Sequence, residues 1–440
     1  MTSRAIETDH PARTQRHAVA AMTFATGVIV ANNYYAQPLE DALAGAFHAS
    51  SSAIGAVLTL IQLSYALGLA TLVPLGDLLE RRRLIVTMVS VTVIGMVLVA
   101  VAPTLGVLAA AAAMVGLTTV AAQVLVPFAA HLAPKGQEGK MISTVMSGLL
   151  IGVLVSRVVA GLVSQALGWR AVFILGALLT AVSVALLWRT LPVLPPATRV
   201  RYPALLRSVL TLLREEPVLR WRIVYSASSY AAFGALWTSI GFMLAAPPHN
   251  FNEGSIGLFA LFGVAGAVGA RFAGRLADRG WAHYAVGGFL AVAVVAWVPI
   301  SEGAGAGVGA LVALAIGLLL FDLGVQGVHV SNQAIIYALR PDARSRINSA
   351  YMTLYFLGGA AGSGLSAVLY AGHGWRGVSV LGVALPAVGL VLWVVDTVLR
   401  RRAVSVSSRA IPAGTGTPSP TGSAPGRPRS SRSGRRSPAR

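Results

Sequence analysis

The fold is decided by a short polar loop at residues 73–83, which reads VPLGDLLERRR, and by the stretches that flank it. Apolar residues dominate on both sides, at 52–75 and 84–102. Each stretch is long enough to cross a bilayer as a helix, for which about 20 residues are needed. The loop therefore reads as a tight, charged turn between two membrane spans.

The same alternation of apolar stretch and polar break continues along the chain. Twelve stretches are expected to be membrane-spanning helices, at 17–38, 52–75, 84–102, 105–130, 141–165, 171–191, 221–245, 255–273, 283–301, 305–332, 347–371 and 377–399. The predicted fold class is thus an all-α integral membrane protein of twelve transmembrane helices.

Composition supports a membrane protein over a soluble one. Hydrophobic residues make up 55% of the chain and charged residues 11%, with a mean hydropathy of +0.72. Soluble domains usually carry about 25% charged residues, which their water-facing surface requires. The chain also lacks cysteine, so disulfides, thiolate nucleophiles and cysteine-based metal sites are excluded.

The basic residues give the expected orientation. Of the 34 lysines and arginines, 31 fall in the N-terminal tail, in alternate breaks between spans, or in the C-terminal tail. Positive residues favour cytoplasmic loops. The net charge of +19 is therefore interpreted mainly as an orientation signal, with both termini in the cytoplasm of a multi-pass protein of the cell membrane.

The chain repeats itself after about 200 residues. Gly168-Trp169-Arg170 precedes the sixth predicted span, and Gly374-Trp375-Arg376 precedes the twelfth. Parallel repeats of six helices are a transporter architecture. The predicted organisation is an N-terminal tail, a six-helix bundle, a cytoplasmic linker, a second six-helix bundle and a basic tail, at 1–16, 17–191, 192–220, 221–399 and 400–440.

The linker and the C-terminal tail each leave alternatives open. The linker is either an amphipathic helix on the membrane surface or a solvated segment. The tail is rich in Ser, Pro, Gly and Arg and is expected to be disordered. Contact between the tail and anionic lipid headgroups is a better interpretation than nucleic-acid binding, and a plain solvated tail is better still.

The loop at 73–83 resembles the signature loop of the major facilitator superfamily. It keeps Leu75, Asp77, Arg81 and Arg82 of that pattern and departs from it at Val73, Leu78 and Glu80. A second copy, Gly274-Arg275-Leu276-Ala277-Asp278-Arg279, matches the opening half of the pattern. The resemblance implies two pseudo-symmetric six-helix bundles, with Asp77, Arg81, Arg82, Gly274, Asp278 and Arg279 as a cytoplasmic gating motif. Plain positive-inside anchoring, with Asp77 as a local counter-ion, is the alternative.

Two charged residues lie well inside predicted spans, away from the span ends, where insertion costs about 2.5–3.5 kcal/mol each. Asp322 is in the tenth span, and Gln326 and His329 share its helix face. Asp322 is the candidate proton-coupling or cation-binding carboxylate, with a structural aspartate as the alternative; for His329 a satisfied interfacial histidine is favoured over a proton relay. Arg157 stands in the fifth span, where the superfamily's antiporter motif has proline. It is expected to bind an anionic substrate, pair with a carboxylate, cap local carbonyls or pack between the halves.

Polar and aromatic residues in other spans are candidates for lining a substrate path. The first span ends in a dense run of such residues, for which an interfacial aromatic belt is the alternative. Gln123 in the fourth span and Tyr230 in the seventh are weaker candidates. The first-span residues are Asn32, Asn33, Tyr34, Tyr35 and Gln37.

These features predict a secondary active transporter. The sequence has no Gly-x-x-x-x-Gly-Lys-Ser/Thr loop for a nucleotide and no paired His-Glu constellation for a membrane metalloenzyme, so neither an ATP-driven pump nor an enzyme is expected, and no cofactor or metal. By resemblance to bacterial efflux permeases and drug–proton antiporters, the expected activity is proton-coupled export of a small molecule by a monomer in a lipid bilayer. An importer or facilitator of the same fold, and a non-transporting receptor or assembly protein, are the alternatives.

Overall fold

The computed structural model describes residues 9–133, 138–193, 201–340 and 344–409. Within these ranges the chain consists of helices joined by short turns and contains no strand. The helices up to Asp396 belong to one compact unit, and the description below concerns that unit. The all-α membrane fold class predicted from the sequence is confirmed.

The first predicted half contains six spans and a short corner. The spans are α1 (Asp9–Ala31), α3 (Ser51–Leu78), α4 (Arg81–Ala100), α5 with α6 (Leu105–Thr118 and Ala121–His131), α7 (Glu138–Leu167) and α8 (Trp169–Thr190). The first of them ends at Ala31, earlier than expected. Turns, the 3-10 helix η1 (Gln37–Leu39) and the short helix α2 (Glu40–Phe47) follow it and form the corner.

The second predicted half has the same order of spans. They are α10 (Pro217–Ala245), the segment α11–η2–α12 (Glu253–Phe259, Ala260–Val264 and Ala265–Asp278), α13 (Ala282–Glu302), α14 (Val308–Leu339) and α15 (Arg344–Arg409). Within α15, Gly374 has φ 59° and ψ −153°, which is not helical and divides it into two spans. This glycine belongs to the Gly-Trp-Arg triplet that marks the repeat in the sequence.

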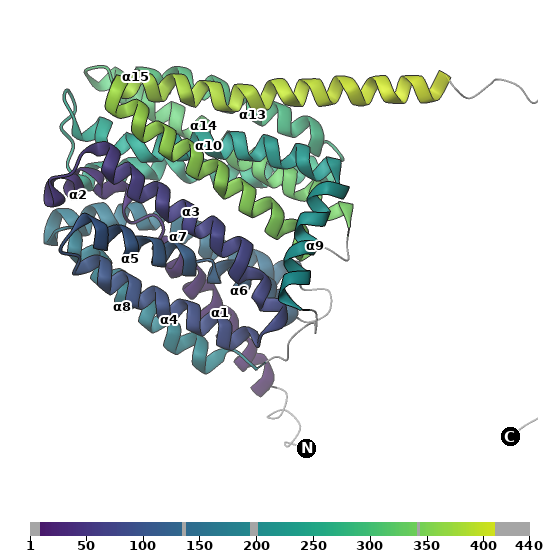
Figure 1. Ribbon diagram of the computed structural model, residues 1–440, viewed down its shortest axis with the longest axis horizontal. Coiled ribbons are helices and arrows are strands. Elements are labelled where there is room, and N and C mark those ends of the chain that lie inside the picture. The colour runs from purple at the N-terminus through teal and green to yellow at the C-terminus, as the bar shows by residue number, and fades with distance from the viewer. Residues whose placement is uncertain (1–8, 134–137, 194–200, 341–343, 410–440) are drawn as a thin grey trace, which may run out of the picture. The chain divides into compact units, whose positions relative to one another are not determined.

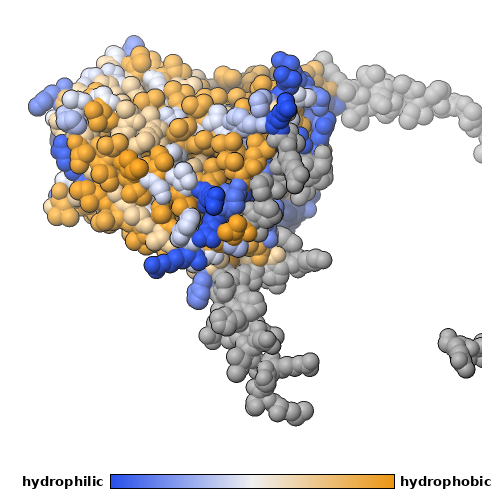
Figure 2. Space-filling view, turned by 60° about the horizontal axis from the view of Figure 1, so that its bottom comes forward, coloured by the Kyte–Doolittle hydropathy of each residue, from blue (hydrophilic) through white to orange (hydrophobic). Residues whose placement is uncertain are grey.

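Nine helical segments of the described chain are long and apolar enough to cross a membrane. The last of these contains the division at Gly374, while α1 contributes a shorter apolar stretch, His17–Ala31. Polar and aromatic side chains lower the hydropathy of α10, which has 29 residues. The arrangement is consistent with the predicted twelve spans. Figure 2 shows the resulting surface, largely hydrophobic, with hydrophilic residues gathered toward one end.

The two ends of the bundle differ in charge. We call the end that carries Arg81–Arg83 and Arg340 the arginine-rich end, and the end that carries α2 the opposite end. At the arginine-rich end, helix α9 (Tyr202–Glu215) lies across the other helices (Figure 1). Part of the predicted linker 192–220 is therefore a helix; residues 194–200 lie outside the described residues.

Helix α9 contacts both predicted halves. The hydroxyl of Tyr202 donates to the carbonyl of Thr71 on α3, at 2.9 Å. At its other end, Arg340 pairs with Glu216 at 2.7 Å and with Glu215 at 3.3 Å. Leu212 is buried in a hydrophobic cluster with residues of both halves. The segment is thus amphipathic, with its apolar side against the protein.

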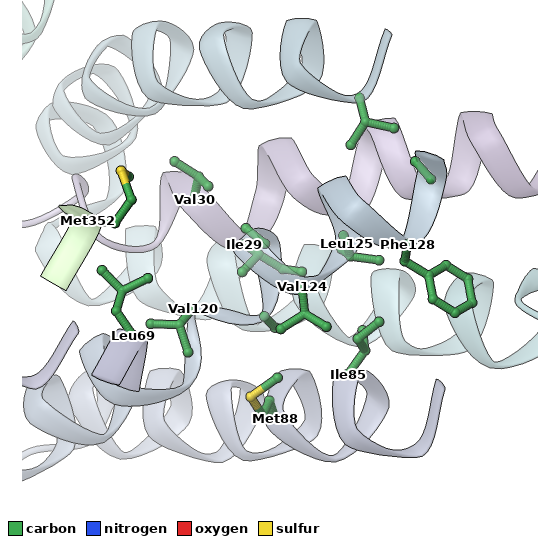
Figure 3. Close-up of a cluster of buried hydrophobic side chains, with 14 of the residues drawn as sticks. Ile29, Val30, Leu69, Ile85, Met88, Val120, Val124, Leu125, Phe128 and Met352 are labelled. Atoms are coloured by element: carbon green, nitrogen blue, oxygen red, sulfur yellow. The ribbon is translucent and has the colours of Figure 1, made fainter. Parts of the chain in front are cut away.

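That cluster lies toward the arginine-rich end and joins the halves. Its members come mainly from the first half, and Figure 3 shows Ile29, Leu69, Ile85 and Phe128 among them, with Met352 of α15 at their edge. Ser349 on α15 also donates to the carbonyl of Leu69, at 3.0 Å.

Candidate functional site

Asp322 lies midway along α14 and is buried, with 6% of its surface exposed. Its neighbour is η2, where Gly263 stands so close that a Cβ there would lie 2.5 Å from Oδ2 of Asp322. Gly266, about one turn after Gly263, likewise leaves room for Gln326. A Cβ on Gly266 would lie 2.8 Å from Cγ of Gln326. Within the described chain, Oδ1 of Asp322 has no hydrogen-bond partner. A side chain this costly to bury and incompletely paired is a functional candidate.

Arg157 lies on α7 and is 3% exposed. Its Nε donates to Oε1 of Gln37 at 2.7 Å. Its Cζ lies 3.9 Å from the ring centroid of Trp237 and 4.9 Å from that of Tyr34. A desolvated contact of this kind contributes about 2 kcal/mol or more. Arg157 thus connects the first and fifth spans with the seventh, which belongs to the other half.

Trp237 links Arg157 to the surroundings of Asp322. The Cβ built on Gly263, which contacts the Asp322 carboxylate, lies 4.0 Å from Cζ2 of Trp237. No ion pair between Asp322 and Arg157 is present in the described chain, although the two are close enough for their charges to interact. Nη2 of Arg157 has no partner among the described residues. The site therefore places the carboxylate of Asp322 and the guanidinium of Arg157 near the indole ring of Trp237. Each of these two charged groups has one polar atom without a hydrogen-bond partner among the described residues.

A pocket opens beside this pair, at the junction of the two halves. Asn33, Tyr34 and Gln37, from the turns and the corner that follow α1, line it together with Tyr230 of α10. Gln123 donates to the hydroxyl of Tyr65 at the pocket wall, at 3.3 Å. The remaining lining residues are Ile61, Gln62, Tyr65, Phe233, Gly234 and Phe356.

Asn32 and Tyr35 lie apart from this pocket, within the first half. Asn32 donates to Thr180 of α8 at 3.0 Å. The ring of Tyr35 lies against Gly176 of the same helix, where a Cβ would be 2.8 Å from Cε2. Because the run turns sharply after Ala31, its side chains divide between the pocket and the packing against α8.

His329 belongs to a polar and aromatic column that leads from the pocket toward the arginine-rich end. Tyr230 stacks on Tyr355 with centroids 3.9 Å apart, and His329 lies 4.7 Å from Tyr355. Nδ1 of His329 is 3.2 Å from the hydroxyl of Tyr351, which also bonds Ser226 at 2.5 Å. Nδ1 of the histidine thus has a local partner in Tyr351.

The residues of the first copy of the predicted gating motif are bonded within the first half. Arg81 donates from Nη2 to Asp77 at 3.2 Å and from Nε to the carbonyl of Gly76 at 2.9 Å. Glu80 caps α4 by accepting from the amides of Arg82 and Arg83. The guanidinium of Arg82 lies 4.5 Å from the ring of Trp188 on α8.

The second copy is more open. A Cβ on Gly274 would meet nothing within 4 Å, and no ion pair of Asp278 or Arg279 occurs among the residues that the structure describes. The two copies are therefore not equivalent in their contacts.

Comparison with known proteins identifies the family. The sequence profile described as Major Facilitator Superfamily matches residues 20–325. The chain belongs to the Major Facilitator Superfamily. It is therefore a multi-pass membrane transporter of a small molecule, and not an enzyme.

Relatives and solved structures agree with this membership. An uncharacterized transporter of Escherichia coli O157:H7, YgaY, is 46% identical to this superfamily member over 375 residues, which cover 85% of this chain and 94% of the relative. A probable sugar efflux transporter of Mannheimia succiniciproducens is 22% identical over 384 residues, 87% of this chain and 94% of the relative. A bacterial homologue of the human lysosomal transporter Spinster, in an inward-facing and unoccupied crystal structure, has the same fold. Its TM-score is 0.67 at 13% identity, covering 90% of this chain and 97% of that one.

Proposed function

We propose that this superfamily member is a proton-coupled exporter of a small organic molecule, working as a monomer in the cell membrane with both termini in the cytoplasm. The observation that carries the proposal is the buried Asp322 carboxylate, held between α14 and η2 with one oxygen unpaired in the described chain. Such a carboxylate gains or loses a proton only when its surroundings change, as they do in alternating access.

Through Arg157, the charge of Asp322 can affect contacts with the segment that follows α1, where Gln37 lies. An ionised Asp322 attracts the guanidinium, and a protonated one does not. Since Arg157 also bonds Gln37 and stacks on Trp237, a change in this attraction alters contacts between the halves. Proton binding and substrate binding would then compete through one network.

The pocket indicates the class of substrate. Its walls combine aromatic rings, such as Tyr65 and Phe233, with the amides of Asn33 and Gln62. Rings bind flat apolar faces, and amides both donate and accept hydrogen bonds. A small, uncharged organic molecule with an apolar face and several hydroxyl or amide groups fits this lining. Export is the direction supported by the similarity to the sugar efflux transporter of M. succiniciproducens.

Purified protein in liposomes with an imposed pH gradient tests the proposal on a panel of such molecules. We expect flux opposite to proton flow, and its loss when a proton ionophore collapses the gradient. Flux in the same direction as protons would show an importer, and flux unaffected by the ionophore would show a facilitator. Absence of flux for the whole panel would favour a receptor or assembly protein.

Asp77→Asn is expected to slow turnover while leaving substrate affinity nearly unchanged. The substitution removes the charge that Arg81 pairs with, far from the pocket. A partly buried pair of this kind is worth about 1 kcal/mol, or roughly fivefold in rate. Initial rates and KM in liposomes measure both quantities. Asp278→Asn, in the second copy, is the matched control with the smaller effect; unchanged turnover of Asp77→Asn would remove the gating role.

A further inference from the structure

The corner formed by η1 and α2 packs against α10 at the opposite end of the bundle, where the two halves meet. Because Gly241 of α10 has no side chain, it leaves space for this corner. A Cβ on Gly241 would lie 2.8 Å from Oε2 of Glu40 and 3.1 Å from the carbonyl oxygen of Gln37. The carboxyl group of Glu40 thus packs directly against the backbone of α10, which belongs to the second half.

Glu40 is fully buried although it begins a short helix near the end of the bundle. Its exposure is 0%, whereas the next residue, Asp41, is exposed. Among the described residues neither Oε1 nor Oε2 has a hydrogen bond of ordinary geometry, although the backbone of Phe242 lies close to the carboxyl group. No cation pairs with Glu40 in the described chain. An unpaired buried charge costs several kcal/mol, so this carboxyl is neutral when it is enclosed.

Among the described residues, the elements around the corner bring no lysine or arginine side chain to Glu40. From Tyr230 to Ala245, α10 carries no acidic or basic residue, and neither does α3 from Ser51 to Gly76. Arg157 on α7 is engaged with Gln37 and Trp237. The other titratable groups on the packed elements and on the corner itself are Tyr35, Asp41, His48, Glu253 and Tyr370.

The opposite end is closed in this structure by contacts between the halves. Thr59 of α3 donates to Ser363 of α15 at 3.1 Å, and Ser363 also bonds Thr238 of α10 at 2.6 Å. Phe242 and Tyr370 of the second half, with ring centroids 5.8 Å apart, pack against the hydrophobic cluster of the first half that contains Leu39 and Leu43. Parting these helices would uncover Glu40 and let water reach it.

We propose that Glu40 is a second proton-binding site of this transporter, whose carboxyl is protonated while the opposite end is closed and releases its proton to water when that end opens. Because the closed state binds more protons, low pH favours closure and high pH favours opening. The inference rests on the proposed transport function, but it does not require Asp322 to be the coupling residue.

Distances across the opposite end test this proposal directly. The chain has no cysteine, so Ala46→Cys on α2 and Ala371→Cys on α15, both exposed, can carry spin labels without other changes. In the otherwise unchanged protein, reconstituted in lipid, we expect a longer-distance population to grow between about pH 5 and about pH 9. In Glu40→Gln, which is neutral at every pH, that population is expected to be lost.

Asp41→Asn and His48→Gln are the matched controls, because each removes a neighbouring titratable group that is not enclosed. Both are expected to keep the pH response. Glu40→Met, which has similar length and no charge, should behave as Glu40→Gln does and serves if the glutamine variant folds poorly. A pH response in Glu40→Gln equal to that of the unchanged protein would overturn the proposal.

The same labels on Asp322→Asn separate the two sites. We expect this variant to keep the pH-dependent opening while losing gradient-driven transport. If it loses the opening and Glu40→Gln keeps it, the sensor is Asp322 and the inference about Glu40 is wrong, with the proposed function intact.

Discussion

Gradient-driven transport by Asp322→Asn is expected to fall to the level of protein-free liposomes. Asparagine fills the same space beside Gly263 but carries no titratable proton, so a cycle that binds and releases a proton at this position cannot run. The measurement is substrate movement against its gradient in liposomes with an imposed pH difference. Exchange of substrate for substrate needs no net proton movement and should persist.

A control variant and a folding measurement accompany this prediction. Glu302→Gln removes an exposed carboxylate from the end of α13 and should transport normally. A melting curve should show that Asp322→Asn folds as well as the unchanged protein, since removing a buried unpaired charge does not reduce packing. Transport against the gradient at the unchanged rate would rule out Asp322 as the coupling site.

Gly152→Val is expected to destabilise the first half strongly. At the crossing of α1 and α7 the backbones touch, and a Cβ on Gly152 would lie 2.2 Å from the carbonyl oxygen of Gly27. Gly148 meets the carbonyl of Thr23 at the same distance. Backbone atoms cannot rotate away as side chains do, so the helices must separate. Overpacking of this kind costs about 1–3 kcal/mol or more.

The measurement is thermal stability in detergent, where a fall in melting temperature of about 3 °C or more is expected. Gly288→Ala in α13 is the control, because a Cβ there meets nothing within 4 Å. Alanine is also the better helix former, so the control should be neutral or slightly stabilising. Equal melting temperatures for the two variants would contradict the close crossing as a source of stability.

Hydropathy was sufficient to predict the spans, because a bilayer requires long apolar helices. The ends of spans were less predictable. The first span was expected to reach residue 38 but ends at Ala31, since Asn32 to Ala36 form turns. The tenth was expected to end at 332, yet α14 continues to Leu339. Hydropathy does not record where a helix leaves the apolar layer.

The sequence predicts those parts of the candidate site where a single residue, by its type alone, is costly to bury. Asp322 and Arg157 stand out because charge inside a span is rare. Trp237 gave only a weak signal, since an aromatic residue in a span is ordinary until a guanidinium is found on its face. Glu40 lies between the first two predicted spans, where an acidic residue is ordinary. Its enclosure is produced by Gly241, which is 201 positions away, and no local pattern records such a contact.

Helix α9 limits how the two halves can move apart during transport. Its 14 residues form a rod of about 21 Å that does not stretch. Tyr202 fastens one end to α3, and the Arg340 pairs fasten the other to α14. That second end is also joined covalently to the second half, because α9 continues through Glu216 into α10. The halves can therefore separate at the arginine-rich end by pivoting about this strut or by releasing the Tyr202 contact. The length of the strut thus limits the width of the opening at this end, which is the entrance in the proposed exporter, and with it the size of the transported molecule.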